Sequence, residues 1–352
     1  MKRSLIRRFL VLLLLCCLLL PTLGCGEGET VWGRDSFLWF DTVTTLTGYG
    51  EAEEFERVWT TVCEELTAYH RLYDIYQPYE GLHNLYTVNE LWEGVHREVQ
   101  VDPRIMDLLR YGREIWERTE GRVNVAMGSL LSLWREYRQQ GLADPASARL
   151  PSKEELEEAA AHADIEKMVL NEERRTVYLA DPQMRLDVGA IAKGYATEMV
   201  ARRLEQEGYE GYLLNVGGNV RAIGGRREGE PFSVGIENPF DTEGDGYLAV
   251  LSLKSRALVT SGSYQRYYTV DGRRYHHIVD PDTRMPAEGY RSVSVLCPSS
   301  AEADALSTAM FLLSVEEGRA LLSHFPEAEA LWVLEDGEIV ASDGFESHQK
   351  KQ

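Results

Sequence analysis

The chain has 352 residues, of which 44% are hydrophobic and 27% are charged, and its acidic residues outnumber its basic ones by 57 to 37. This length allows one large domain or two ordinary ones, and the composition excludes a disordered, collagen-like or multispan membrane protein. The formal net charge of −20 repels phosphate backbones and so argues against a general nucleic-acid binder. A phosphorylated ligand would need a local cation to overcome this charge.

The first residues have the pattern of an export signal. A basic segment precedes an apolar run over residues 9–20, which is too short to span a bilayer. Thr22-Leu23-Gly24-Cys25 follows and is similar to a bacterial lipobox, whose cysteine becomes the lipidated N-terminus. We therefore expect a lipoprotein signal peptide over residues 1–24, a lipid on Cys25, and a protein anchored to the cell membrane on its extracytoplasmic side. A plain secretory signal or a retained anchor is the alternative.

The hydrophobic pattern predicts an α+β fold with mixed or antiparallel sheets and packed helices, because strands occur in consecutive blocks with helices between them. After a tether over residues 25–35, we expect one unit over residues 36–343 and a polar tail over 344–352. Cys63 and Cys297 lie in apolar surroundings, so we expect free thiols. In chain order, the pattern predicts a strand over 37–49, helices over 51–69, 103–121 and 152–162, a turn between two strands over 171–175, a helix over 190–207, strands over 212–216, 232–236, 248–253, 257–260, 264–270, 273–279 and 292–296, helices over 301–314 and 315–324, and a final hairpin at Asp336-Gly337.

The segment over residues 186–195 could bind a phosphate. A predicted strand ends at Asp187, a turn of small residues follows, and a helix begins with Lys193 in its first turn. The N-terminus of a helix offers free N–H groups and positive potential, and Lys193 adds a full charge. The alternative is that Asp187 only caps the helix and Lys193 is an ordinary exposed lysine.

Two adjacent histidines, His276 and His277, lie on a predicted strand. Side chains alternate between the faces of a strand, so Tyr275 and His277 share one face while His276 and Ile278 share the other. Only one histidine can therefore face a given site, as a base or as a phosphate donor. A packed or surface histidine is the alternative.

Asp304 and Thr308 are four residues apart in a strongly apolar predicted helix, and they therefore lie on one face of it. A carboxylate and a hydroxyl are hard oxygen ligands that suit Mg²⁺, which binds few protein groups together with substrate phosphates. The alternative is that Asp304 complements the helix dipole and Thr308 bonds to its own backbone.

Residues 122–128 have the pattern of a turn before a buried helix. The common dinucleotide, NTPase, esterase and zinc-protease motifs are absent from the sequence.

Several of these segments, in this order, resemble the FAD:protein FMN transferase family (ApbE-like flavin transferases, formerly called thiamine-biosynthesis lipoproteins). The resemblance covers about residues 36–343. Phe40 stands where the family commonly has Met, Asn124 and Ala126 stand where many members have Asp and Thr, and Arg284 stands where Gly is usual. The matching segments are Phe40-Asp41-Thr42, Asn124-Val125-Ala126-Met127-Gly128, residues 187–194, Asn215-Val216-Gly217-Gly218-Asn219, Thr260-Ser261-Gly262-Ser263-Tyr264, His277-Ile278-Val279-Asp280-Pro281, and Ala303-Asp304 with Ser307-Thr308.

The resemblance implies that the protein binds FAD and Mg²⁺ and transfers FMN to a threonine or serine hydroxyl of an extracytoplasmic redox protein, with release of AMP. It implies metal ligands at the Ala190 carbonyl, Asp304 and Thr308. His277 or Asp187 would help to take the acceptor's proton, and Lys193 would lie near the pyrophosphate. The implied flavin or nucleotide contacts are Phe40, Tyr76, Asn124, Val125, Ala126, Met127, Asp187, Lys193, His277 and Ile278. An FAD pyrophosphatase with water as acceptor, or a lipid-anchored flavin-binding protein without turnover, would use the same site.

The lipobox interpretation predicts that Cys25→Ser releases the protein from the membrane. A lipobox cysteine carries more than one acyl chain, which is enough for stable anchoring where a single chain is marginal. Membrane fractionation and mass spectrometry of the N-terminal peptide measure the effect. Unchanged fractionation of the variant, together with no acyl mass on the wild-type peptide, would contradict the prediction.

Overall fold

The computed structural model describes residues 30–90, 97–241, 246–264 and 266–350, and Val31–Gln352 form one compact unit. The predicted signal peptide and Cys25 lie outside the described residues. None of the helices in the described ranges is long and apolar enough to cross a membrane. Helices and antiparallel strand ladders alternate along the chain, which confirms the predicted α+β class.

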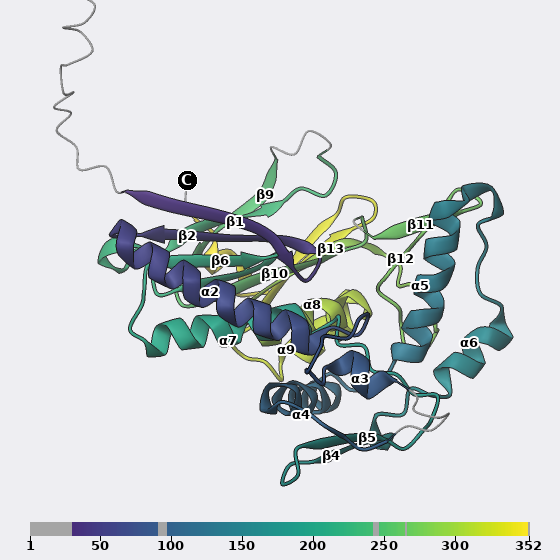
Figure 1. Ribbon diagram of the computed structural model, residues 1–352. Coiled ribbons are helices and arrows are strands. Elements are labelled where there is room, and N and C mark those ends of the chain that lie inside the picture. Colours follow the sequence, from purple (N-terminus) through teal and green to yellow (C-terminus); the bar gives the residue numbers. More distant parts are fainter. Residues whose placement is uncertain (1–29, 91–96, 242–245, 265, 351–352) are drawn as a thin grey trace, which may run out of the picture. The chain divides into compact units, whose positions relative to one another are not determined.

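The unit is built on an eight-stranded antiparallel sheet (Figure 1). Its strands bring together parts of the chain that are far apart in the sequence, because β2 pairs with β6 and β7 pairs with β10. The order across the sheet is β1 (Val31–Trp39), β2 (Thr42–Tyr49), β6 (Tyr212–Val216), β7 (Asn219–Ile223), β10 (Ala257–Gly262), β13 (Tyr290–Cys297), β14 (Glu329–Leu334) and β15 (Ile339–Ala341).

Both faces of the central strands are buried. On β14, Ala330 and Trp332 belong to one hydrophobic cluster while Leu331 and Val333 belong to another, as the two-residue period of a strand requires. The first cluster lies under α2 (Ala52–Tyr73), α7 (Ala192–Gln206) and α8 (Ser300–Phe311) (Figure 1). The second is covered by the hairpin of β8 (Phe232–Glu237) and β9 (Tyr247–Leu253) and by Phe345. This double burial explains why these strands read as continuous apolar runs.

Helix α8 is the most deeply buried of these three helices. Nearly all of its residues are buried, including Asp304 and Ser307, and it packs against α7, β10 and β13. Because it is apolar on all sides, it behaves as a core helix. The Ser299 hydroxyl accepts a hydrogen bond from the Glu302 N–H and so caps its first turn.

The remaining elements lie beside the sheet and its helices. A third hydrophobic cluster joins α5, α6 and the β11–β12 hairpin, which lie side by side in Figure 1. In chain order, all the elements outside the main sheet, its three helices and the β8–β9 hairpin are α3 (Leu85–Asn89), β3 (Val99–Gln100), α4 (Pro103–Arg118), α5 (Gly128–Ala143), η1 (Pro145–Ser147), α6 (Lys153–Ala160), η2 (Ile165–Lys167), β4 (Met168–Asn171), β5 (Thr176–Leu179), η3 (Arg227–Gly229), β11 (Tyr267–Val270), β12 (Arg273–His276), α9 (Val315–Leu322) and η4 (Phe345–His348).

The structure corrects the predictions at both ends of the unit. Residues 31–35 are not a tether, because β1 begins at Val31 and pairs with β2. The predicted strand over 37–49 is two strands, separated by a turn at Phe40 and Asp41 with φ values of 53° and 52°. Residues 344–350 are not a free tail, because Phe345 is fully buried and the Lys350 N–H donates to the Val250 carbonyl.

The helical face contains a buried charged network that holds α7, α8 and the sheet together. Glu198 on α7 and Arg221 on β7 are 2% and 4% exposed. One Glu198 carboxylate oxygen accepts hydrogen bonds from Arg221 Nε at 3.2 Å and from the Ser300 N–H at 2.9 Å. The other accepts from Arg202 Nε at 2.8 Å. The network thus fixes the start of α8 against α7.

Glu198→Gln is expected to lower the free energy of unfolding by about 3 kcal/mol, because it leaves a buried guanidinium without its full counter-charge. Urea denaturation measures the change. The control is Glu207→Gln on an exposed pair, whose carboxylate accepts from Arg203 Nε at 3.0 Å, and its effect should stay within about 0.5 kcal/mol. Equal effects of the two substitutions would contradict the assigned role.

Candidate functional site

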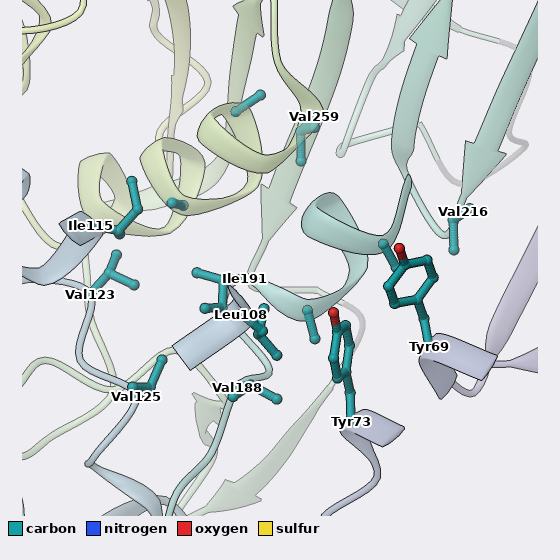
Figure 2. Close-up of a cluster of buried hydrophobic side chains, with 14 of the residues drawn as sticks. Tyr69, Tyr73, Leu108, Ile115, Val123, Val125, Val188, Ile191, Val216 and Val259 are labelled. Carbon is teal, nitrogen blue, oxygen red and sulfur yellow. The ribbon is translucent and has the colours of Figure 1, made fainter. Parts of the chain in front are cut away.

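A cavity of about 650 Å³ opens where the turn between β1 and β2, the ends of α2 and α7, and the middle of α8 meet. This volume lies within the range of small-molecule sites. Val123, Val125 and Val188 line it and belong to the buried cluster drawn in Figure 2, where Leu108 and Ile191 lie close to them. The cavity therefore rests on a rigid apolar base.

The contact between α7 and α8 places one carboxylate in this cavity. The Gly194 N–H, in the first turn of α7, donates to Asp304 Oδ2 at 2.8 Å. A Cβ on Gly194 would lie 2.3 Å from Asp304 Cβ and 2.5 Å from the Ser300 carbonyl oxygen. Only glycine therefore allows the two helices to come this close.

Asp304 has the charge environment of a ligand-binding group. Its side chain is 5% exposed, and its Oδ1 lies 3.6 Å from Lys193 Nζ. Burial raises the pKa of Asp304 above its usual value, and the Lys193 ammonium opposes that shift. The dipole that Asp304 complements belongs to α7 rather than to its own helix.

The resemblance implies three residues as metal ligands through their oxygen atoms, and all three line the same cavity. They are Asp304, Thr308 and Ala190. A carboxylate, a hydroxyl and a carbonyl are hard donors that fit Mg²⁺. Within the described ranges there is no group of three or more His, Cys, Asp or Glu side chains that could hold a metal ion. A cation at Asp304 would therefore depend on ligand phosphates for most of its counter-charge.

Asp187 is held in place by backbone contacts with a distant segment. Its N–H donates to the Val125 carbonyl at 2.8 Å, and the Gly128 N–H donates to the Arg185 carbonyl at 2.9 Å. Asp187 Oδ1 accepts from the Gly189 N–H at 2.9 Å, so it caps the turn before α7 rather than the helix itself. These bonds fix the cavity wall that residues 122–128 and 185–189 share.

Asn89 is a positioning residue that the analysis of sequence patterns missed. It is 5% exposed, its amide donates to the Leu186 carbonyl at 2.9 Å, and its carbonyl oxygen accepts from the Leu186 N–H at 2.7 Å. Both bonds connect residues 97 positions apart. No local pattern could reveal such a contact.

The predicted flavin and nucleotide residues line the cavity, except for Ala126, which is fully buried. The Ala126 N–H donates to Asn124 Oδ1 at 2.8 Å, and Asn124 Nδ2 donates to the Ala163 carbonyl at 2.8 Å. Phe40 has a φ of 53° and packs edge-on against His70 with ring centroids 5.5 Å apart. Arg284 has a φ of 63°, which explains why glycine suits that position.

The two adjacent histidines have different environments. The strand β12 ends at His276, so the predicted alternation does not extend to His277, and both histidines line the cavity. The His276 ring lies 2.7 Å from the Ala287 carbonyl oxygen and accepts from the Ile278 N–H. His277 opens onto the cavity, where desolvation, followed by neighbouring positive charges, lowers its pKa to about 3. Its ring is therefore neutral at pH 7.

Comparison with known proteins shows which family this chain is similar to. The family model described as the ApbE family matches residues 40–332. The FAD:protein FMN transferase of Treponema pallidum (strain Nichols) is 35% identical over 260 residues, which is 70% of this chain and 70% of that protein. The FAD:protein FMN transferase of Escherichia coli (strain K12) is 31% identical over 225 residues, 63% of this chain and 62% of that protein.

Among solved structures, the ApbE protein of Thermotoga maritima is 28% identical, with a TM-score of 0.78 over 92% of this chain and 100% of that one. The flavin transferase ApbE from Vibrio cholerae is 24% identical, with a TM-score of 0.73 over 91% of this chain and 100% of that one, and shares the fold. The family model matches most of the chain, and the fold is shared with solved structures of the family. This chain therefore belongs to the ApbE family.

Proposed function

We propose that this protein transfers FMN from FAD to a threonine or serine hydroxyl of a partner redox protein and releases AMP. Family membership and the activity named for its relatives support the reaction. The observation that carries the proposal is the buried Asp304 carboxylate, held between the Gly194 N–H and Lys193 on a cavity wall. In a protein with a net charge of −20, this is where a cation and a pyrophosphate could be bound together.

Mg²⁺ is the cation that we propose for this position. Asp304, Thr308 and the Ala190 carbonyl would hold it, since their oxygens line one cavity. When bound, Mg²⁺ would neutralise developing negative charge on the phosphate oxygens. Lys193 would add a second positive charge beside the same pyrophosphate.

The chain's own residues can position the groups and move the proton. The acceptor oxygen forms a bond to the FMN phosphorus, the bond from that phosphorus to the AMP phosphate breaks, and AMP leaves. We assign the proton of the acceptor hydroxyl to His277, because its ring has no hydrogen-bond partner among the described residues. The Asp187 carboxylate already accepts from the Gly189 N–H and lies 3.8 Å from Arg135 Nη2.

We propose an extracytoplasmic, lipid-anchored location for this reaction. Its support is the segment Thr22-Leu23-Gly24-Cys25 after a short apolar run. The competing activity is hydrolysis of FAD to FMN and AMP, in which water replaces the acceptor hydroxyl at the same site. A flavin-binding protein without turnover is the third alternative.

Incubating the protein with FAD, Mg²⁺ and a threonine-containing acceptor domain tests the function directly. Transfer adds FMN to the acceptor and is detected by intact mass. Free FMN with AMP and an unmodified acceptor would indicate a pyrophosphatase, and unchanged FAD would indicate a binding protein.

In the same assay, we expect His277→Asn to lower the transfer rate by about 100-fold or more, and Asp187→Asn to lower it less.

Asp304→Asn is expected to lower transfer by about 100-fold or more while the protein stays folded. Asparagine can still accept the Gly194 hydrogen bond, so the thermal unfolding midpoint should change little. Thr308→Ala should have a smaller effect on transfer, because water can replace a neutral ligand. Excess Mg²⁺ should partly restore the Asp304→Asn variant.

The matched control is Glu316→Gln, an exposed carboxylate at the start of α9 that does not line the cavity. It should transfer FMN at the wild-type rate. Full activity of Asp304→Asn, with only a small loss of stability, would refute the metal-ligand role and leave Asp304 as a helix-capping group.

A further inference from the structure

The two-residue turn between β1 and β2 has an uncommon backbone conformation. Trp39 pairs with Thr42, and Phe40 and Asp41 between them have φ values of 53° and 52°. Positive φ at both central residues is typical of hairpin turns that favour Asn-Gly or Asp-Gly. Aspartate tolerates this region, but a bulky aromatic residue rarely adopts it. Phe40 therefore keeps this strained conformation only because its surroundings hold it there.

The contact that holds Phe40 comes from α2, which packs against β1 (Figure 1). The Phe40 N–H donates to His70 Nδ1 at 3.3 Å. The two rings also meet edge-on, with centroids 5.5 Å apart. Because Nδ1 accepts this bond, the proton of the neutral His70 ring lies on Nε2. His70 thus gives Phe40 both a hydrogen bond to its backbone and a packing surface for its ring.

The sheet fixes the turn from the other side. The Gly217 N–H, directly after β6, donates to the Val43 carbonyl at 2.9 Å. A Cβ on Gly217 would lie 2.3 Å from Thr42 Oγ1, so glycine is required for this close approach. The turn is therefore held between the end of β6 and α2, and His70 supplies the contact from the α2 side.

Both His70 and Phe40 line the cavity, and both are half-buried, so a ligand can reach them. Phe40 is one of the residues that the resemblance implies as flavin or nucleotide contacts, and it stands where the family commonly has Met. A methionine side chain is flexible and adapts to its ligand. A phenyl ring on a strained turn has to be placed before the ligand binds. His70 is the cavity residue that can do this.

We propose that His70 is a positioning residue for FAD. Its Nδ1 holds the Phe40 N–H and so fixes the Phe40 ring on the cavity wall, where the ring contacts bound FAD. The inference rests on the proposed function, because it requires FAD in this cavity. Loss of the acceptor would let the strained turn relax and move the ring, while Asp304 and Lys193 would still hold the pyrophosphate. His70 therefore acts on FAD affinity rather than on the chemical step.

Two substitutions separate the hydrogen bond from the ring contact. His70→Phe keeps an aromatic ring and removes the acceptor. His70→Asn removes the ring and keeps an acceptor, because its Oδ1 is attached to Cγ as Nδ1 is in histidine. FAD affinity is measured by quenching of flavin fluorescence in the presence of Mg²⁺. Transfer kinetics with the threonine-containing acceptor domain give the KM for FAD and kcat.

His70→Phe should weaken FAD affinity and raise the KM for FAD by about tenfold, while kcat stays within about twofold of the wild-type value. His70→Asn should bind FAD within about threefold of the wild-type affinity, because the Phe40 N–H keeps its acceptor. If His70→Phe does not fold, His70→Leu removes the acceptor with a smaller side chain and serves the same comparison.

The matched control is Thr67→Val, one turn earlier on α2. Thr67 Oγ1 accepts from Trp39 Nε1 at 2.9 Å, and neither of these residues lines the cavity. The substitution should lower the thermal unfolding midpoint, because it leaves a buried donor unpaired. It should not change FAD affinity. The comparison separates the positioning of FAD from general support of the β1–β2 hairpin.

Three results would overturn the inference. The first is an FAD affinity of His70→Phe within about twofold of the wild-type value. The second is weaker FAD binding by His70→Asn than by His70→Phe, which would assign the effect to ring packing. The third is an equal loss of affinity in Thr67→Val. A wild-type protein that binds FAD but transfers no FMN would instead contradict the transferase function, and the measured affinities would still test His70.

Discussion

The close approach of α7 to α8 is the constraint on which the rest of the site depends. The Gly194 N–H donates to Asp304 Oδ2, and no side chain larger than hydrogen fits between the two helices at that point. The Asp304 carboxylate is therefore fixed on both sides: the α7 backbone binds one oxygen, and Lys193 lies near the other. A buried carboxylate is costly unless it is paired in this way, and the arrangement gives it a set position at the cavity wall.

The surrounding fold keeps that position rigid. Glu198 connects the start of α8 to Arg221 on the central sheet, and Asn89 fixes the segment that leads to Asp187. The cavity wall is thus made of chain segments whose backbones are bonded to one another rather than of a loose loop. Rigid support of this kind is what in-line phosphoryl transfer requires, since the reaction depends mainly on positioning and on neutralised charge.

The sequence predicted the parts of this arrangement that are local. The face shared by Asp304 and Thr308 and the lysine in the first turn of α7 follow from helical spacing alone, and the structure has both. The resemblance identified the segments that line the cavity. Periodicity could not show that Asp304 binds the N-terminus of a neighbouring helix, nor that Asn89 holds Leu186, because these contacts connect residues 110 and 97 positions apart. The turn at Phe40 and Asp41 was missed because an aromatic residue rarely adopts a positive φ, as Phe40 does here.

The most direct test of this account is a crystal structure of the protein grown with FAD and Mn²⁺, which replaces Mg²⁺ and gives an anomalous signal. The account predicts an anomalous peak at coordination distance from Asp304, Thr308 and the Ala190 carbonyl, in contact with the pyrophosphate of FAD. A well-defined FAD molecule with no peak at Asp304, or with the pyrophosphate bound away from Asp304 and Lys193, would contradict it.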